Sequence, residues 1–132
     1  IRDHCVTGVQ TCALPICTGQ WMKGKSADGF GPIGPWLVTK DEVRNPEALD
    51  LWLDVNGIRM QQACTRQMIL SPSRLVSYVS QFMSLQPGDI IATGTPGGIG
   101  MAQNPPRFLL PGDRVSLGVA GLGTQVHSVK SW

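Results

Sequence analysis

The chain has 132 residues, 42% of them hydrophobic, and a formal net charge of +2, which together predict one domain with its own core. Its Lys and Arg residues are scattered, no apolar run approaches the roughly 20 residues that span a bilayer, and the start lacks the pattern of a signal peptide. These observations argue against a nucleic-acid or membrane partner, and we expect a soluble cytoplasmic protein.

The first 17 residues stand apart from the rest of the chain. Residues 6–16 (VTGVQTCALPI) resemble the conceptual translation of a common sequencing-library adapter. We therefore expect residues 1–17 to be non-native sequence that did not evolve to fold, and residues 18–132 to form the domain. The same segment holds Cys5, Cys12 and Cys17, whose spacing matches no CxxC metal pair, so we expect reduced thiols rather than a framework of disulfides.

A glycine- and proline-rich stretch follows at residues 24–36 (GKSADGFGPIGPW). This composition disfavours a regular helix or a central strand. The stretch carries Lys25, Ser26 and Asp28, and a chain that orders such a loop commonly does so to bring backbone and side chains to a ligand. An equally open alternative is a surface turn that leads into an apolar strand at residues 36–39.

The next segments predict a hairpin and a helix. Alternating apolar residues at 49–55 predict a half-buried strand, Asn56 and Gly57 predict a type I′ turn, and residues 58–62 can return as the partner strand. Ser71 and Pro72 suit the N-cap and the first residue of a helix over residues 72–84. Its apolar residues recur at helical spacing and are expected in the core: Leu75, Val76, Val79, Phe82 and Met83.

Two Pro-Gly-Asp turns divide the C-terminal part of the chain, at residues 87–89 and 111–113. An apolar segment follows each turn and predicts a strand, at residues 90–92 and 115–119, and another strand is predicted at 124–129. One helix among several short strands predicts an α+β, β-dominated fold, a mixed β-sandwich or roll. The loop at residues 95–107 is expected outside the sheet.

A second glycine-rich stretch, residues 92–100 (ATGTPGGIG), is another candidate site. No Lys-Ser or Lys-Thr follows its glycines, and Pro105 and Pro106 cannot open a phosphate-binding helix, so a nucleotide site is rejected. Thr93 and Thr95 lie at the end of the predicted strand beside backbone amides freed by glycines, which suits a carboxylate or an oxyanion. An ordinary turn is an equally open interpretation.

The remaining polar residues predict no catalytic cluster. His127 alternates with valines, which favours a packed or surface imidazole, and no histidine lies near a plausible Ser or Cys nucleophile. Glu42 and Glu47 are the only glutamates and are expected in solvent. Asp28 is the only carboxylate in a candidate site, and one carboxylate does not hold Mg²⁺.

From about residue 19 onward the chain resembles the C-terminal catalytic domain of the fumarylacetoacetate hydrolase family. The resemblance rests on four ordered motifs, at residues 24–36, 55–57 (VNG), 85–96 (LQPGDIIATGTP) and 112–115 (GDRV). Residues 20–25 and 36–43 look most like those of family members that act as ureidoglycolate lyase or 2,4-diketo-3-deoxy-L-fuconate hydrolase. The resemblance implies a mixed β-sandwich roll that often forms a homodimer.

The resemblance also implies chemistry that depends on Mg²⁺ or Mn²⁺, with hydrolysis or lysis of a C–C bond in a 2-oxo acid or acylpyruvate. Lys25 matches the family lysine beside metal and substrate, which gives it a catalytic and substrate-binding role. Thr95 matches the threonine that holds the substrate carboxylate. Gly29 stands where many relatives have a threonine near the metal-bound water, so that contact is absent or supplied otherwise.

The family's metal carboxylates, a Glu-x-Glu pair and an Asp, lie upstream of the lysine and have no counterpart in this sequence. No residue of the chain is therefore assigned to the metal, and two hypotheses follow. In the first, the chain is an incomplete part of a metal-dependent hydrolase or lyase and is inactive alone. In the second, it is a non-catalytic, β-rich binding or structural module. Incompleteness also predicts marginal stability and exposed apolar sheet surface.

Overall fold

A computed structural model of the chain describes residues 6–7, 19, 21–26 and 28–131. Cys5, Cys12 and Cys17 and most of the 1–17 segment lie outside this part, so the predictions made for them stay predictions. The helices and strands of the described residues are, in order, β1 (Val6–Thr7), α2 (Trp21–Lys25), β2 (Asp50–Val55), β3 (Ile58–Cys64), α3 (Pro72–Val79), β4 (Arg114–Val119) and β5 (Gly123–Lys130). Short 3₁₀ turns occupy Thr65–Gln67 and Gly100–Ala102.

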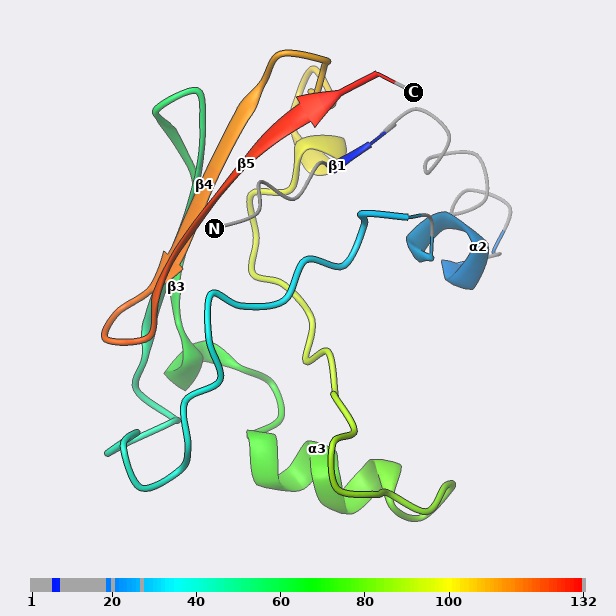
Figure 1. Ribbon diagram of the computed structural model, residues 1–132, viewed down its shortest axis with the longest axis vertical. Helices are drawn as coiled ribbons and strands as arrows, with labels where there is room; N and C mark the ends of the chain where they lie inside the picture. Colours follow the sequence, from blue (N-terminus) through cyan, green and yellow to red (C-terminus); the bar gives the residue numbers. More distant parts are fainter. Residues whose placement is uncertain (1–5, 8–18, 20, 27, 132) are drawn as a thin grey trace.

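The strands form a single sheet in the order β1-β5-β4-β2-β3. Strands β2 to β5 pair antiparallel, and the two-residue β1 pairs parallel with the end of β5. In Figure 1 the sheet stands on one side, irregular chain coloured cyan and yellow runs along its other side, and α3 lies at the foot. The predicted β-dominated α+β class is confirmed.

The hairpin between β2 and β3 is built as predicted. Asn56 and Gly57 both have positive φ, 52° and 79°, which a type I′ turn requires and which Asn and Gly tolerate best. Val55 pairs with Ile58 across the turn. The return strand runs two residues beyond the predicted end, to Cys64.

Strand alternation gives the sheet an inner face toward the irregular chain and an outer face toward solvent. On the inner face the buried hydrophobic core of the described residues is Val55, Val115 and Val129, with Leu53 and Leu117 packed against it. On the outer face the Arg59 guanidinium lies 4.8 Å from the centre of the Trp52 ring and pairs with Asp54. The small core is consistent with the expected marginal stability.

Two predicted strands are absent. Residues 36–39 and 90–92 belong to irregular chain, where Leu37 is 87% exposed and Ile90 is 70% exposed. A strand is stable only where a neighbour completes its hydrogen-bond ladder. The described chain offers neither segment such a neighbour, so apolar sequence alone does not make them strands.

The helix α3 begins at Pro72 as predicted, but it ends at Val79 rather than at Ser84, and its apolar stripe is not buried. Val76 is 48% exposed, Phe82 69% and Met83 60%. The Tyr78 and Phe82 rings stack edge to face, 5.0 Å apart, on the exposed side. The predicted core-facing stripe is thus only partly formed: Leu75 and Val79 are half-buried, and Leu75 lines a pocket with Met68 and Leu70, whereas the other members of the stripe are exposed.

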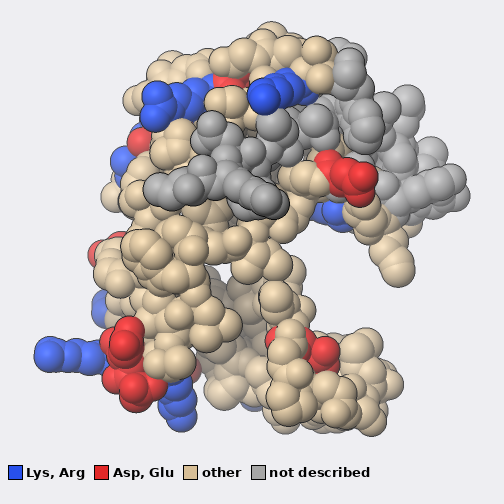
Figure 2. Space-filling model, in the orientation of Figure 1, with Lys and Arg blue, Asp and Glu red and all other residues tan. Residues whose placement is uncertain are grey.

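Charge is dispersed over the surface. Figure 2 shows Lys, Arg, Asp and Glu in small separate groups, with uncharged residues over most of the visible face. Within the described ranges, no helix is long and apolar enough to cross a membrane.

Candidate functional site

The two glycine-rich stretches meet the inner face of the sheet through two glutamines. Gln61 on β3 pairs with Leu53 on β2, Leu53 pairs with Leu117 on β4, and Leu117 pairs with Gln125 on β5. The four residues form one cross-strand row. Because directly paired residues share a face, both glutamines point toward the irregular chain that covers this face.

Gln61 holds the second glycine-rich stretch. Its side chain is only 9% exposed. The amide Nε2 donates to Thr95 Oγ1 at 2.9 Å and to the carbonyl oxygen of Pro96 at 2.8 Å, with the carbonyl oxygen of Gly97 at 3.4 Å. One buried amide therefore fixes the turn that carries Thr95 to the sheet.

Gly98 lets this turn approach the sheet closely. A Cβ atom at this position would lie 2.0 Å from the Met60 carbonyl oxygen, and the residue has a φ of 102°. Both facts require glycine, since any side chain would push the turn away from β3. Gly98 thus has a packing role, which sequence composition alone left open.

Gln125 holds the first glycine-rich stretch. Its Nε2 donates to the Gly34 carbonyl oxygen, and its Oε1 lies 2.8 Å from Nε2 of His127. His127 is 5% exposed, which confirms the packed alternative for this imidazole. A Cβ atom on Gly123 would contact the Trp36 ring at 2.7 Å, so residues 34–36 lie against the start of β5.

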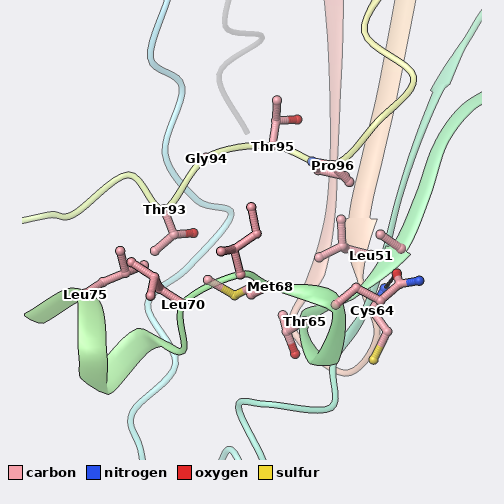
Figure 3. A pocket seen from close by; sticks show the side chains of 13 residues that line it. Leu51, Cys64, Thr65, Met68, Leu70, Leu75, Thr93, Gly94, Thr95 and Pro96 are labelled. Carbon is pink, nitrogen blue, oxygen red and sulfur yellow. Dashed lines mark hydrogen bonds between the residues drawn. The ribbon is translucent and has the colours of Figure 1, made fainter.

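Thr93 and Thr95 line one pocket, but their side chains point in different directions. Figure 3 shows the Thr93 side chain directed toward Leu70 and Leu75, whereas Thr95 projects from the opposite side of the segment. Gly94 separates the two threonines and has a φ of 97°, which breaks the regular strand geometry between them. Both threonines line an apolar pocket of about 490 Å³ with Met68 and Leu70, and the Thr95 hydroxyl also contacts Gln61.

Lys25 lies apart from that pocket. It is the last residue of α2, is exposed, and is not among the residues that line the pocket of Thr93 and Thr95. Gly24 and Lys25 are helical, which corrects the expectation of no regular helix from residue 24 onward. The irregular loop begins at Ser26 because the glycines and prolines that break a helix cluster after that point.

The described residues do not form a metal site. No group of three or more His, Cys, Asp or Glu side chains within them could hold a metal ion. Glu42 and Glu47 are exposed, as expected of charges in a solvated loop, and Asp28 is exposed as well. A hydrogen bond from the Thr39 side chain lowers the pKa of the exposed Asp41 carboxyl.

Sequence reasoning missed Gln61 and Gln125. The available signal was the alternation of inward and outward side chains along a strand. Gln125, His127 and Val129 occupy successive inward positions of β5. A polar residue at an inward position requires a hydrogen-bond partner. Which carbonyl it finds depends on the packing of loops that are distant in sequence.

The fold and site define a class: a β-dominated domain in which the side-chain amides of two inward-facing glutamines hold both glycine-rich stretches to one sheet face, and one of these amides also contacts a threonine hydroxyl. A family model described as the fumarylacetoacetate hydrolase C-terminal domain matches residues 7–130. The chain belongs to the fumarylacetoacetate hydrolase family, and the resemblance drawn from its motifs is confirmed. The match overlaps the 1–17 segment without deciding whether that segment is native.

Individual relatives agree with the family. A Burkholderia ambifaria protein with a provisional hydrolase name is 56% identical over 114 residues, which cover 86% of this chain and 40% of that protein. The structure of a fumarylacetoacetate hydrolase from psychrophilic Exiguobacterium antarcticum matches with a TM-score of 0.86 and 37% identity, covering 91% of this chain and 43% of that chain. This chain spans about two fifths of the length of the curated relatives it matches.

A maleylpyruvate hydrolase from Sphingobium sp. SYK-6, solved in complex with manganese(II) and pyruvate, matches with a TM-score of 0.76 and 38% identity. The match covers 86% of this chain and 40% of that chain. That structure thus brings a 2-oxo acid and a divalent metal together on a related protein.

Proposed function

We propose that this chain provides the carboxylate-binding part of a metal-dependent enzyme that acts on 2-oxo acids, hydrolysing a C–C bond of an acylpyruvate. The observation that carries the proposal is the attachment of both glycine-rich stretches to one sheet face through Gln61 and Gln125. Family membership and the pyruvate bound by the Sphingobium relative support the same substrate class.

In this proposal Thr95 binds the substrate carboxylate and Lys25 stabilises negative charge on the substrate. A hydroxyl donates one hydrogen bond, and bonds to charged groups contribute about 1.5–3 kcal/mol. The ammonium of Lys25 would have to approach the Thr95 turn once substrate binds, because Lys25 does not line the pocket that Thr95 lines.

The metal, Mg²⁺ or Mn²⁺, would act as a Lewis acid in the complete enzyme. The described residues do not supply its ligands. We therefore assign no residue of this chain to the metal and expect the chain alone to be inactive.

Two finer choices belong to the proposal. We favour acylpyruvate hydrolysis over the ureidoglycolate lyase reaction because the Sphingobium relative is named a maleylpyruvate hydrolase and holds pyruvate. The second candidate function is a non-catalytic binding module. The lack of a metal-binding cluster in the described residues favours it.

The direct test is a calorimetric titration of the chain with pyruvate, with and without Mn²⁺. We expect Thr95→Val to weaken pyruvate binding about tenfold, the effect of one hydrogen bond to a charged group. The matched control is Thr93→Val, which alters the threonine on the other side of the segment and should leave the affinity unchanged. Equal effects of the two variants would contradict the proposed role of Thr95.

Turnover separates the two candidate functions. The chain alone, incubated with Mn²⁺ and an acylpyruvate, is expected to release no pyruvate, and turnover would reject its inactivity. Restoring activity by adding the upstream half of a family member, and losing it again with Lys25→Met, would support the enzyme. The control is Lys40→Met, at an exposed lysine outside the candidate site. Pyruvate binding without any restored turnover would favour the binding module.

A further inference from the structure

We infer that Gln61 is a positioning residue that holds the Thr95 turn against β3 and forces the Thr95 hydroxyl to donate its hydrogen bond toward the ligand. The inference rests on the proposed function for its ligand, a carboxylate. Gln61 itself does not need to touch the substrate, because it acts through Thr95.

Two carbonyl oxygens determine the orientation of the Gln61 side-chain amide, that is, which positions its NH₂ group and its oxygen occupy. The oxygens of Pro96 and Gly97 face the same side-chain atom, at 2.8 and 3.4 Å. A carbonyl oxygen only accepts hydrogen bonds, so the atom that faces it must be the NH₂ group and not the amide oxygen. Burial reinforces this orientation, because the reversed amide would set two oxygens against each other out of water.

The amide orientation in turn fixes the polarity of the hydroxyl. Nε2 carries only donors, so Thr95 Oγ1, 2.9 Å away, must accept from it. The hydroxyl has one hydrogen, and that hydrogen has no acceptor among the residues that the structure describes. Thr95 is exposed, so the hydrogen can reach a ligand oxygen. The result is a donor preset for an anion, without reorganisation on binding.

The first test needs no ligand. Gln61→Met keeps the length of the side chain and removes the amide, and Gln62→Met makes the same change at the exposed neighbouring residue on the other face of β3. We expect the backbone ¹⁵N order parameters of residues 94, 95, 97 and 98 to fall in Gln61→Met and to stay unchanged in Gln62→Met, because the turn loses its attachment to β3 only in the first variant. Unchanged order parameters in Gln61→Met would overturn the inference whatever the function of the protein.

The second test is a double-mutant cycle on pyruvate affinity. Gln61→Met should weaken pyruvate binding about tenfold in the wild-type background and less than about twofold in the Thr95→Val background, because Gln61 acts through the hydroxyl. Equal losses in both backgrounds would make Gln61 a merely structural residue and overturn the inference. If the order parameters of the turn respond to Gln61→Met but the wild-type chain binds no pyruvate, the proposed function fails while the attachment of the turn stands.

The third test covers the case in which Gln61→Met fails to fold. Gln61→Glu keeps the shape, but an ionised carboxylate can only accept, so it should draw the Thr95 hydrogen away from the ligand. Burial against two carbonyl oxygens disfavours the ionised form and raises the pKa of this introduced carboxyl, so lowering the pH from about 8 to about 5 should protonate it and restore a donor. The affinity of Gln61→Glu for pyruvate should recover as the pH falls over that range. Pyruvate stays ionised throughout, and the affinity of the wild-type chain should not change. A pyruvate affinity of Gln61→Glu that does not change with pH would overturn the inference.

Discussion

Asn56 and Asp113 join the hairpin turn after β2 to the turn before β4. The Asn56 side-chain Nδ2 donates to Asp113 Oδ1 at 2.7 Å, and Asn56 Oδ1 accepts from the backbone N–H of Arg114 at 2.8 Å. Asp113 Oδ2 also accepts from the backbone N–H of Leu110 at 2.9 Å. Two turns 57 residues apart in sequence are thereby held side by side.

The first prediction concerns this link. Asn56→Gly should lower the free energy of unfolding by about 1–2 kcal/mol, because it removes two hydrogen bonds while glycine still tolerates the positive φ of the turn. Thermal or urea denaturation followed by circular dichroism measures the change. An unfolding midpoint equal to that of the wild type would mean that water replaces the side chain at no cost.

The second prediction concerns acid. Hydrogen bonds from the Leu110 backbone and the Asn56 side chain, helped by nearby Arg107, hold the pKa of Asp113 below its ordinary value. A carboxyl whose pKa is lower when folded contributes stability above its unfolded pKa, and this stability is lost as the pH falls through the folded pKa. Asp113→Asn should therefore make the melting temperature less sensitive to pH below about 4.

The Asn56→Gly variant should show an intermediate form of this acid sensitivity. It removes one of the two hydrogen bonds to the carboxylate, so its melting temperature should depend on acid to an intermediate degree. A pH profile of Asp113→Asn that matches the wild type would contradict the assignment.

The third prediction uses two adjacent glycines. Gly98→Ala should destabilise the chain by about 2–4 kcal/mol, because its Cβ would lie 2.0 Å from the Met60 carbonyl oxygen at a positive φ. Gly97→Ala is the control, since a Cβ there meets nothing within 4 Å. Denaturation midpoints should separate the two variants clearly. A similar cost for both would show that the turn does not pack against β3.

The fourth prediction concerns the 1–17 segment. Deleting residues 1–17 should change the free energy of unfolding by no more than about 1 kcal/mol, because the described part of this segment contributes only the two-residue β1. Chemical denaturation of the truncated chain tests this. Loss of cooperative unfolding would mean that the segment belongs to the fold.

The fifth prediction concerns the exposed apolar residues of α3 and of the turn after it. We expect the chain to associate as its concentration rises, because Val76 and Tyr78 on the helix are 48% and 57% exposed and Phe82 just beyond its end is 69% exposed. Sedimentation velocity should show this, and Phe82→Ser should reduce it. Ser77→Ala, on the same helix, is the control. A monomer at all concentrations would count against both this surface and the homodimer that the family resemblance implies.

The sequence by itself determined the local structure. Asn56-Gly57 predicted its turn because few residue pairs tolerate two positive φ angles, and the alternation around Leu51 and Leu53 predicted β2 because strand side chains alternate with period two. The family motifs predicted the family, and the Pro-Gly-Asp turns fell where expected.

Only the tertiary structure decided which residues work together. The apolar runs at 36–39 and 90–92 were not strands, because strand formation depends on a neighbour that no local pattern specifies. The threonines at 93 and 95 looked like a pair, yet the positive φ of Gly94 sends them to opposite sides. Gln61 meets Thr95 across 34 residues, and Gln125 meets Gly34 across 91. A hydrogen bond between distant residues exists only once the sheet register and the loop packing bring donor and acceptor together.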